Sequence, residues 1–243
     1  MIASSKSTAG SRASTWDRVA SSYDSTRKKD PVYISCIHLT ARVVPKDTVI
    51  CLDAGCGTGL SSEAVSSKCR IVIAVDYSRD SLKILRSKNL QNVILVQADL
   101  TALPFKESVF NACVCANAFQ HLAPGSQHDI AASELKRVTK EKGILSVSVH
   151  HYSRSKQKAG WIKEGKPGQA GIDYIYRFNR DYFQSLFPDS IVKGIGYYGW
   201  LKVPFWGSRL QNVIGILFGK IAAFLGFGHM LISITPKIQK NRR

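Results

Sequence analysis

The sequence predicts an α/β protein with a doubly wound, mainly parallel sheet. Short, unbroken runs of Val, Ile, Leu, Ala and Cys alternate along the chain with segments of helical periodicity. Strands that are covered by helices on both faces have this continuous apolar character. The first such run, 49–53, leads directly into a turn with alternating glycines, Gly55, Gly57 and Gly59. Sheets of this kind bind ligands at such turns.

Each element follows from a run of this type and its bounding turn residues. Ser78 is expected to cap a helix, and the segment from Tyr174 is expected to be helical only from Asn179. We expect helices at 61–67, 78–88, 128–140 and 179–187. We expect seven strands, at 49–53, 71–76, 93–97, 112–116, 144–150, 191–198 and 230–235.

The chain of 243 residues is long enough for one well-buried domain. Residues 1–15 are rich in Ser, Thr and Ala and are expected to be a disordered tail, so the single domain is 16–243. A basic, Gly-rich loop is expected at 153–171, and an apolar insertion at 200–228 precedes the last strand. Apolar residues at helical spacing predict an amphipathic helix over 203–225 within this insertion.

Charge is concentrated near the C-terminus. The chain carries a net charge of +17, and residues 151–243 hold 15 basic and 4 acidic residues. An anionic membrane surface or a nucleic acid would be attracted to such a region, although the charge could also serve solubility alone. The longest uncharged apolar stretch, 221–236, has 16 residues, fewer than the roughly 20 that span a bilayer.

The six cysteines never form a C-x-x-C pair and mostly lie in apolar runs. This pattern argues against a disulfide framework and against a zinc site. We therefore expect reduced thiols and an intracellular, cytoplasmic protein, with peripheral membrane contact as an option and organelle targeting left open.

An acidic residue follows the glycine turn at the end of the next predicted strand. Asp76 ends the second strand, 17 residues after Gly59, where a carboxylate can accept hydrogen bonds from both ribose hydroxyls of a nucleotide. The turn does not fit the dinucleotide pattern, because that pattern would require Gly or Ala at Leu60 or Ser62. The combination predicts an adenosine-containing cofactor at the carboxyl ends of the strands.

Four ordered motifs within 16–152 resemble the class I S-adenosylmethionine-dependent methyltransferases, particularly the methyltransferase type 11 branch with the quinone-biosynthesis enzymes. The motifs are Asp53 to Gly59, Val75 to Ser78, Gln97 to Phe105, and Phe110 to Leu122 followed by Glu134 to Val138. The chain departs from the family pattern at Asn111, where Asp is usual, and at 141–143, where Pro-Gly-Gly is usual.

The resemblance implies a Rossmann-like sheet of order 3-2-1-4-5-7-6 with the last strand antiparallel, and an N-terminal lid at 16–45. It implies S-adenosyl-L-methionine as cofactor and no metal. The residues expected to bind this cofactor are Asp53, Gly55, Cys56, Gly57, Gly59, Asp76, Tyr77, Ala98, Asp99, Leu100, Asn117 and Ala118.

Methyl transfer from a sulfonium is an in-line displacement, so positioning and water exclusion can supply most of the catalysis. His121 is the candidate general base if the acceptor arrives protonated, with packing in a loop as the alternative. Tyr23 resembles the lid tyrosine of the family, whose ring could lie beside the sulfonium. The residues expected around the acceptor are Phe119, His151, Tyr152, Tyr176 and Trp206.

Three functions remain open. The first is methyl transfer to an apolar small-molecule or lipid-like acceptor, favoured by the apolar insertion. The second is methylation of tRNA, of the wobble-uridine type, because Tyr23 to Arg27 and the His121 motif resemble such enzymes and the C-terminal charge suits phosphate contacts. The third is a non-catalytic scaffold that keeps the cofactor fold.

Overall fold

Seven strands form one sheet in the computed structural model, which describes residues 13–166, 172–195, 221, 224–226, 228 and 230–235. Strands β1 to β5 are parallel, and β9 runs antiparallel to both β5 and β8. This arrangement confirms the predicted fold class and strand order. The order across the sheet is β3 (Val93–Gln97), β2 (Cys69–Asp76), β1 (Thr48–Ala54), β4 (Phe110–Ala116), β5 (Thr139–His150), β9 (Met230–Thr235) and β8 (Ile191–Ile195).

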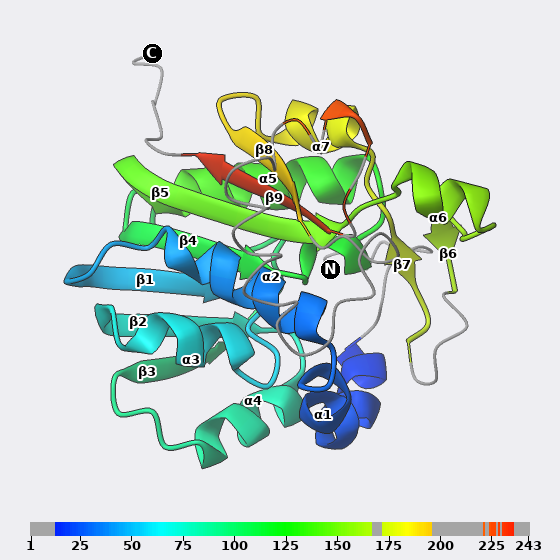
Figure 1. The fold of residues 1–243 in the computed structure, drawn as a ribbon. Helices are drawn as coiled ribbons and strands as arrows, with labels where there is room; N and C mark the ends of the chain where they lie inside the picture. Colours follow the sequence, from blue (N-terminus) through cyan, green and yellow to red (C-terminus); the bar gives the residue numbers. More distant parts are fainter. Residues whose placement is uncertain are drawn as a thin grey trace, which may run out of the picture.

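Helices cover both faces of the sheet (Figure 1). One face carries α2 (Pro31–Arg42), α3 (Leu60–Ser66) and α4 (Arg79–Ser87), and the other carries α5 (Ser126–Val138) and α7 (Arg180–Leu186). Successive strand residues point to opposite faces: Ile73 and Val75 pack with α5 and α7, whereas Val72 packs with α2 and α3. The strands are therefore buried on both sides, as their unbroken apolar runs predicted.

Two helix boundaries differ from the sequence expectation. The helix expected at 128–140 begins at Ser126 and ends at Val138, and the following strand starts at Thr139 rather than 144. The backbone amides of Ser108 and Val109 donate hydrogen bonds of 2.9 Å to the carbonyls of Arg137 and Val138. These contacts tie the end of the helix to the neighbouring loop, and β5 takes over from the next residue.

The N-terminal segment is helical earlier than expected. Helix α1 spans Ala13–Arg27, so residues 13–15 are not part of a disordered tail, and the Thr15 hydroxyl donates to the Asp173 carboxylate. Residues 1–12 lie outside the described part. So do 196–198 of the strand expected at 191–198, and most of the apolar insertion at 200–228, including Trp206.

The basic loop expected at 153–171 contains regular structure. It holds the short helix α6 (Arg154–Lys158) and strand β6 (Glu164–Gly165), which pairs antiparallel with β7 (Ile175–Tyr176). The Ser153 hydroxyl caps α6 by accepting from the Lys156 amide. This small sheet lies beside the carboxyl end of β5, at the right of Figure 1.

All six cysteines are free thiols with buried side chains. Burial raises the pKa of Cys36 and Cys115 to about 12. Within the residues that the structure describes, no helix is long and apolar enough to cross a membrane, and no group of His, Cys, Asp and Glu side chains gathers as a metal site would require.

Candidate functional site

The glycine turn after β1 has a backbone that requires glycine. Gly55, Gly57 and Gly59 all have positive φ, at 73°, 52° and 97°. A Cβ on Gly55 would lie 2.3 Å from the Cβ of Ala118, while a Cβ on Gly57 would meet no atom within 4 Å. The turn therefore packs closely against the loop after β4 and leaves open space at its middle glycine.

Asp76 joins the end of β2 to this turn. Its Oδ2 accepts a hydrogen bond of 2.7 Å from the Gly57 amide, and its Oδ1 accepts one of 2.8 Å from the Ser78 amide. Burial raises the pKa of this carboxyl, and the backbone donors partly offset the increase. Each oxygen keeps a lone pair for a further donor.

Asp53 lies beneath the turn rather than beside the open space. The side chain is fully buried, and its Oδ2 accepts from the hydroxyls of Ser61 at 2.8 Å and Ser62 at 2.6 Å. Burial raises its pKa to about 6. Asp53 thus holds the first turn of α3 against the end of β1.

A cavity of about 360 Å³ lies at the carboxyl ends of the parallel strands. Its lining brings together the glycine turn, the end of β2, the loops after β3 and β4, and the helices α1 and α2. The predicted cofactor residues that line it are Gly55, Cys56, Gly57, Asp76, Tyr77, Ala98, Asp99, Leu100, Asn117 and Ala118. Asp53 and Gly59 do not line it.

Two cavity side chains keep unused polar atoms. Asp99 Oδ1 accepts from the amide and the hydroxyl of Thr101, at 2.8 and 2.7 Å, and its Oδ2 has no hydrogen-bond partner in the described chain. Asn117 is buried with φ of 56°, its Oδ1 accepts from the Ser148 hydroxyl at 3.5 Å, and its Nδ2 has no partner there either. An acceptor and a donor are therefore available to a ligand.

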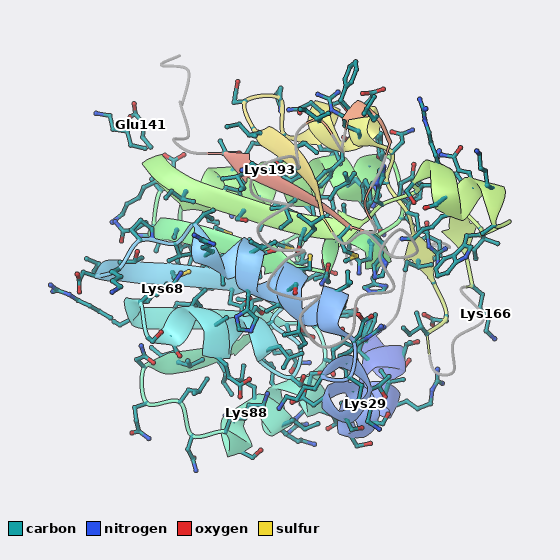
Figure 2. The ribbon with its side chains drawn as sticks, in the orientation of Figure 1. Lys29, Lys68, Lys88, Glu141, Lys166 and Lys193 are labelled. Carbon is teal, nitrogen blue, oxygen red and sulfur yellow. The ribbon has the colours of Figure 1, made fainter. Side chains whose placement is uncertain are left out.

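Helix α1 closes the cavity from the side opposite the strands. Two acidic residues fix it: Asp17 accepts from the Ser78 hydroxyl at 2.7 Å and from the Asp80 amide at 3.1 Å, while Asp24 accepts from the Thr58 hydroxyl. Lys88 adds an ion pair with Asp24 at 2.9 Å; its label in Figure 2 lies below α3, next to α4. The lid is thus joined to the turn and to α4.

The lid contributes two aromatic side chains to the cavity, Trp16 and Tyr23. The Tyr23 hydroxyl lies 2.7 Å from the hydroxyl of Tyr33, which comes from α2. The Arg27 guanidinium stacks over both rings, at 5.4 and 5.1 Å from their centroids. Burial raises the pKa of Tyr33 well above its ordinary value, so its hydroxyl stays neutral.

His121 lines the cavity and carries its proton on a defined nitrogen. Its Nδ1 lies 3.0 Å from the carbonyl oxygen of Tyr174, which can only accept, so Nδ1 is the protonated nitrogen. The Trp16 ring packs on it with centroids 4.4 Å apart. Burial lowers the pKa of His121 to about 4, so the ring is neutral at pH 7, with Nε2 as acceptor.

Four of the residues expected around the acceptor lie outside the lining of this cavity. Phe119 is fully buried in the core, where its ring stacks on His128, and Tyr176 packs edge-on against the same His128. The His151 Nδ1 donates to the Gly228 carbonyl at 3.0 Å, and the Tyr152 amide donates to the Phe178 carbonyl. None of these four lines the cavity, and Trp206 lies outside the described residues.

Sequence reasoning missed several lining residues. Trp16 stands in the expected lid, and aromatic size was the signal that could have singled it out. Tyr33, Ile37, Thr101 and Gln127 carry no motif, because their place depends on how α2 and the loops after β3 and β4 fold back.

The residues present fit S-adenosylmethionine. The cavity offers a carboxylate beside a glycine turn, a second carboxylate oxygen without a partner, an amide donor and aromatic faces. Open space at Gly57 leaves room for a ligand to approach the backbone. These are the donors and acceptors that ribose, adenine and an amino acid moiety require.

Residues 52–147 match a family described as "Methyltransferase domain". The chain is 32% identical over 123 residues to a malonyl-[acyl-carrier protein] O-methyltransferase of Erwinia pyrifoliae, covering 50% of this chain and 45% of that protein. It is 29% identical over 143 residues to a demethylmenaquinone methyltransferase of Corynebacterium urealyticum, covering 56% and 58%. The chain thus spans less than two thirds of the length of these relatives.

Solved structures share the fold. The complex of DhpI with S-adenosylhomocysteine superimposes with a TM-score of 0.62 at 14% identity, covering 92% of this chain and 93% of that one. A geranyl diphosphate methyltransferase gives 0.57 at 16%, covering 82% and 75%. The matched methyltransferase domain, the methyltransferases among the curated relatives and the strand order all agree with the resemblance to the S-adenosylmethionine-dependent methyltransferases.

Proposed function

We propose that the protein transfers a methyl group to an apolar small-molecule or lipid-like acceptor by in-line displacement. One observation carries the proposal: the cavity combines a polar floor at the strand ends with an apolar and aromatic roof from α1 and α2. When bound, S-adenosylmethionine supplies a methyl group on a positively charged sulfur. The apolar and aromatic roof favours an apolar acceptor over a polar macromolecule.

In this proposal the chain's polar residues hold the cofactor. Asp76 accepts from the ribose hydroxyls through the lone pairs left free beside Gly57 and Ser78. Asp99 Oδ2 accepts from the adenine amine, and Asn117 Nδ2 donates toward the amino acid moiety. The rings of Tyr23 and Trp16 line the same cavity and would lie beside the positive sulfur, where an aromatic face is favourable.

His121 positions the acceptor in the same scheme. Its neutral ring presents Nε2 as a hydrogen-bond acceptor, because Nδ1–H is engaged by Tyr174. A pKa near 4 makes the imidazole a weak base, so proton transfer to it suits an acidic acceptor proton, and orientation of the nucleophile is its main contribution.

We also propose contact with an anionic membrane surface for a cytoplasmic protein that reaches lipid-like acceptors. Ile221, Phe224 and Leu225 are exposed by 59%, 74% and 41%, and Arg180 lies over the Phe224 ring at 6.0 Å. Exposed apolar side chains beside basic ones are how interfacial segments bind lipid. We also propose that residues 16–243 form a single domain.

The tRNA alternative has its own support. The chain is 26% identical over 128 residues to the tRNA (carboxymethyluridine(34)-5-O)-methyltransferase alkbh8 of Xenopus tropicalis, covering 52% of this chain and 19% of that protein. The excess of basic residues in 151–243 suits phosphate contacts.

A product screen with labelled S-adenosylmethionine decides between these functions. The full chain would be incubated with lipid extract, tRNA and small phenols, with Asp76→Ala as the background control. Label transferred to lipid or phenol by the unmodified protein alone supports the proposal. Label found only in tRNA contradicts it and selects the alternative.

A further inference from the structure

A second cluster of charged side chains lies away from the cavity, where α6, β6 and β7 meet at the right of Figure 1. Arg177 and Lys156 are each only 4% exposed. Both lie against one tryptophan: the Trp161 ring centroid is 5.0 Å from the Arg177 guanidinium carbon and 5.4 Å from the Lys156 Nζ. Trp161 itself is 42% exposed, so the ring separates the two cations from solvent.

The Arg177 guanidinium has one edge in use and one edge unused. Nη1 donates a hydrogen bond of 2.6 Å to the Ile162 carbonyl. Nε is buried without a partner, and Nη2 likewise has none among the residues described. Nε and Nη2 form the edge that binds both oxygens of a carboxylate or a phosphate.

No acidic side chain of the protein pairs with Arg177. All 17 acidic residues of the sequence lie in the described ranges, and Arg177 forms an ion pair with none of them. Burial lowers the pKa of Arg177, and burial together with the Arg177 charge lowers the pKa of Lys156 to about 7. A buried guanidinium beside a second basic side chain is costly unless an anion joins it.

The cluster is connected to the cavity through the backbone. The Tyr174 carbonyl holds His121, and Arg177 follows on the same segment, with its amide donating to the Lys163 carbonyl at 2.8 Å. Lys156 Nζ donates 2.9 Å to the carbonyl of His151, which follows the end of β5. The two basic side chains therefore lie beside the carboxyl end of β5, and Arg177 lies three residues from the carbonyl that binds His121.

We propose that Arg177 and Lys156 form a binding site for the carboxylate or phosphate group of an otherwise apolar acceptor, with Trp161 as its cover. The assignment of that anion to the acceptor rests on the proposed methyl transfer. The site itself does not, because it is defined by the unused guanidinium edge and the absence of a carboxylate.

Sulfate is a suitable probe, because it presents the same oxygens and stays dianionic from pH 5 to 9. Calorimetric titration of the full chain with sodium sulfate at constant ionic strength should show saturable binding. Arg177→Gln should weaken that binding at least tenfold, and Arg177→Lys should keep part of it. Lys158→Gln, on the exposed side of α6, is the matched control and should leave it unchanged.

Two results would overturn the site: no saturable sulfate binding by the unmodified chain, or equal binding by Arg177→Gln. Should Arg177→Gln fail to fold in thermal unfolding, Lys156→Met replaces it, with the same requirement of a loss of at least severalfold. S-adenosylhomocysteine binding, measured on the same samples, reports separately on the proposed function and should not change in any of these variants.

The acceptor assignment has its own test, once the screen has identified an acceptor. Arg177→Gln should raise the KM for that acceptor at least tenfold while kcat changes little, and sulfate should compete with the acceptor. A lowered kcat with unchanged KM, or absence of competition, would leave a site for a free anion and overturn its role in acceptor binding.

Discussion

The two sides of the methyltransferase fold handle buried charge in opposite ways. On the proposed cofactor side, the Asp76 carboxylate accepts hydrogen bonds from the amides of Gly57 and Ser78. On the proposed acceptor side, the Arg177 guanidinium is buried against a carbonyl oxygen and a tryptophan ring, and no acidic side chain pairs with it. The buried carboxylate thus has donors from the chain, whereas the buried guanidinium has no acidic side chain beside it.

The largest effect is expected from replacing His121, which lines the cavity and donates to the Tyr174 carbonyl. His121→Ala should lower kcat by about 10² or more, because the acceptor loses its positioning contact, while S-adenosylhomocysteine affinity changes little. Steady-state kinetics and calorimetry measure the two effects. His38→Ala, on the exposed side of α2, is the control. A kcat within a factor of three of the parent would reduce His121 to a packing residue.

Asp76→Ala tests the cofactor side. The variant removes two charged hydrogen-bond acceptors at the ribose, and cofactor affinity should fall at least about tenfold. Calorimetry with S-adenosylmethionine measures it. Asp80→Ala is the matched control, because Asp80 is partly exposed and pairs only with Lys83 on the same helix. Undiminished binding by Asp76→Ala would contradict the assignment.

Acid should lower the stability of the fold through His128. Its Nε2 donates to the Leu122 carbonyl at 3.1 Å and its Nδ1 lies 3.1 Å from the Tyr182 hydroxyl. Burial lowers its pKa from 6.5 to about 4, so the unfolded chain binds more protons between these values. Stability is then complete above pH 6.5 and falls as the pH drops toward 4, by at most about 3 kcal/mol.

His128→Phe isolates this contribution. The variant should be less stable at pH 7, because the Leu122 carbonyl loses its donor, but its stability should decline less between pH 6.5 and 4 than that of the parent. Urea unfolding at several pH values measures both. Asp53 contributes in the opposite direction. Burial raises its pKa to about 6, so protonation in acid removes the cost of burying a charged carboxylate. Parallel pH curves for parent and variant would show that His128 does not titrate with folding.

The smallest effect is expected at the surface. Phe224→Ser should reduce flotation of the full chain with anionic vesicles a few-fold, because one exposed aromatic side chain is lost from the proposed interface. Ile130→Ser, on α5, removes a side chain that is 47% exposed elsewhere and should have no effect. A parent chain that stays in the soluble fraction at low salt would refute membrane contact and favour the tRNA alternative.

The sequence predicted the sheet because local patterns determine it. Unbroken apolar runs placed Val93–Gln97 and Met230–Thr235 at their observed bounds. The sequence also brought Gly55, Asp76 and Asp99 to one cavity, because they sit in motifs whose spacing is fixed by the strands. The residues of the proposed acceptor side could not be predicted in this way. Phe119 and Tyr176 were expected near the acceptor for their aromatic character, yet packing on His128 draws them into the core. Arg177 carries no motif, and only tertiary contacts reveal its unused edge.

Burial makes the native cysteines slow to react with thiol reagents in the folded protein. All six cysteines are shielded, and Cys56, which lines the cavity, has a pKa raised well above its ordinary value by burial. A maleimide dye should therefore label the folded chain slowly, with Cys69 as the first site because its pKa is lowered by the hydrogen bond to Cys51, and the unfolded chain at every cysteine. The rate of thiol labelling therefore reports on unfolding. A cysteine introduced at an exposed position such as Phe224 would react with a fluorophore without prior removal of the native cysteines.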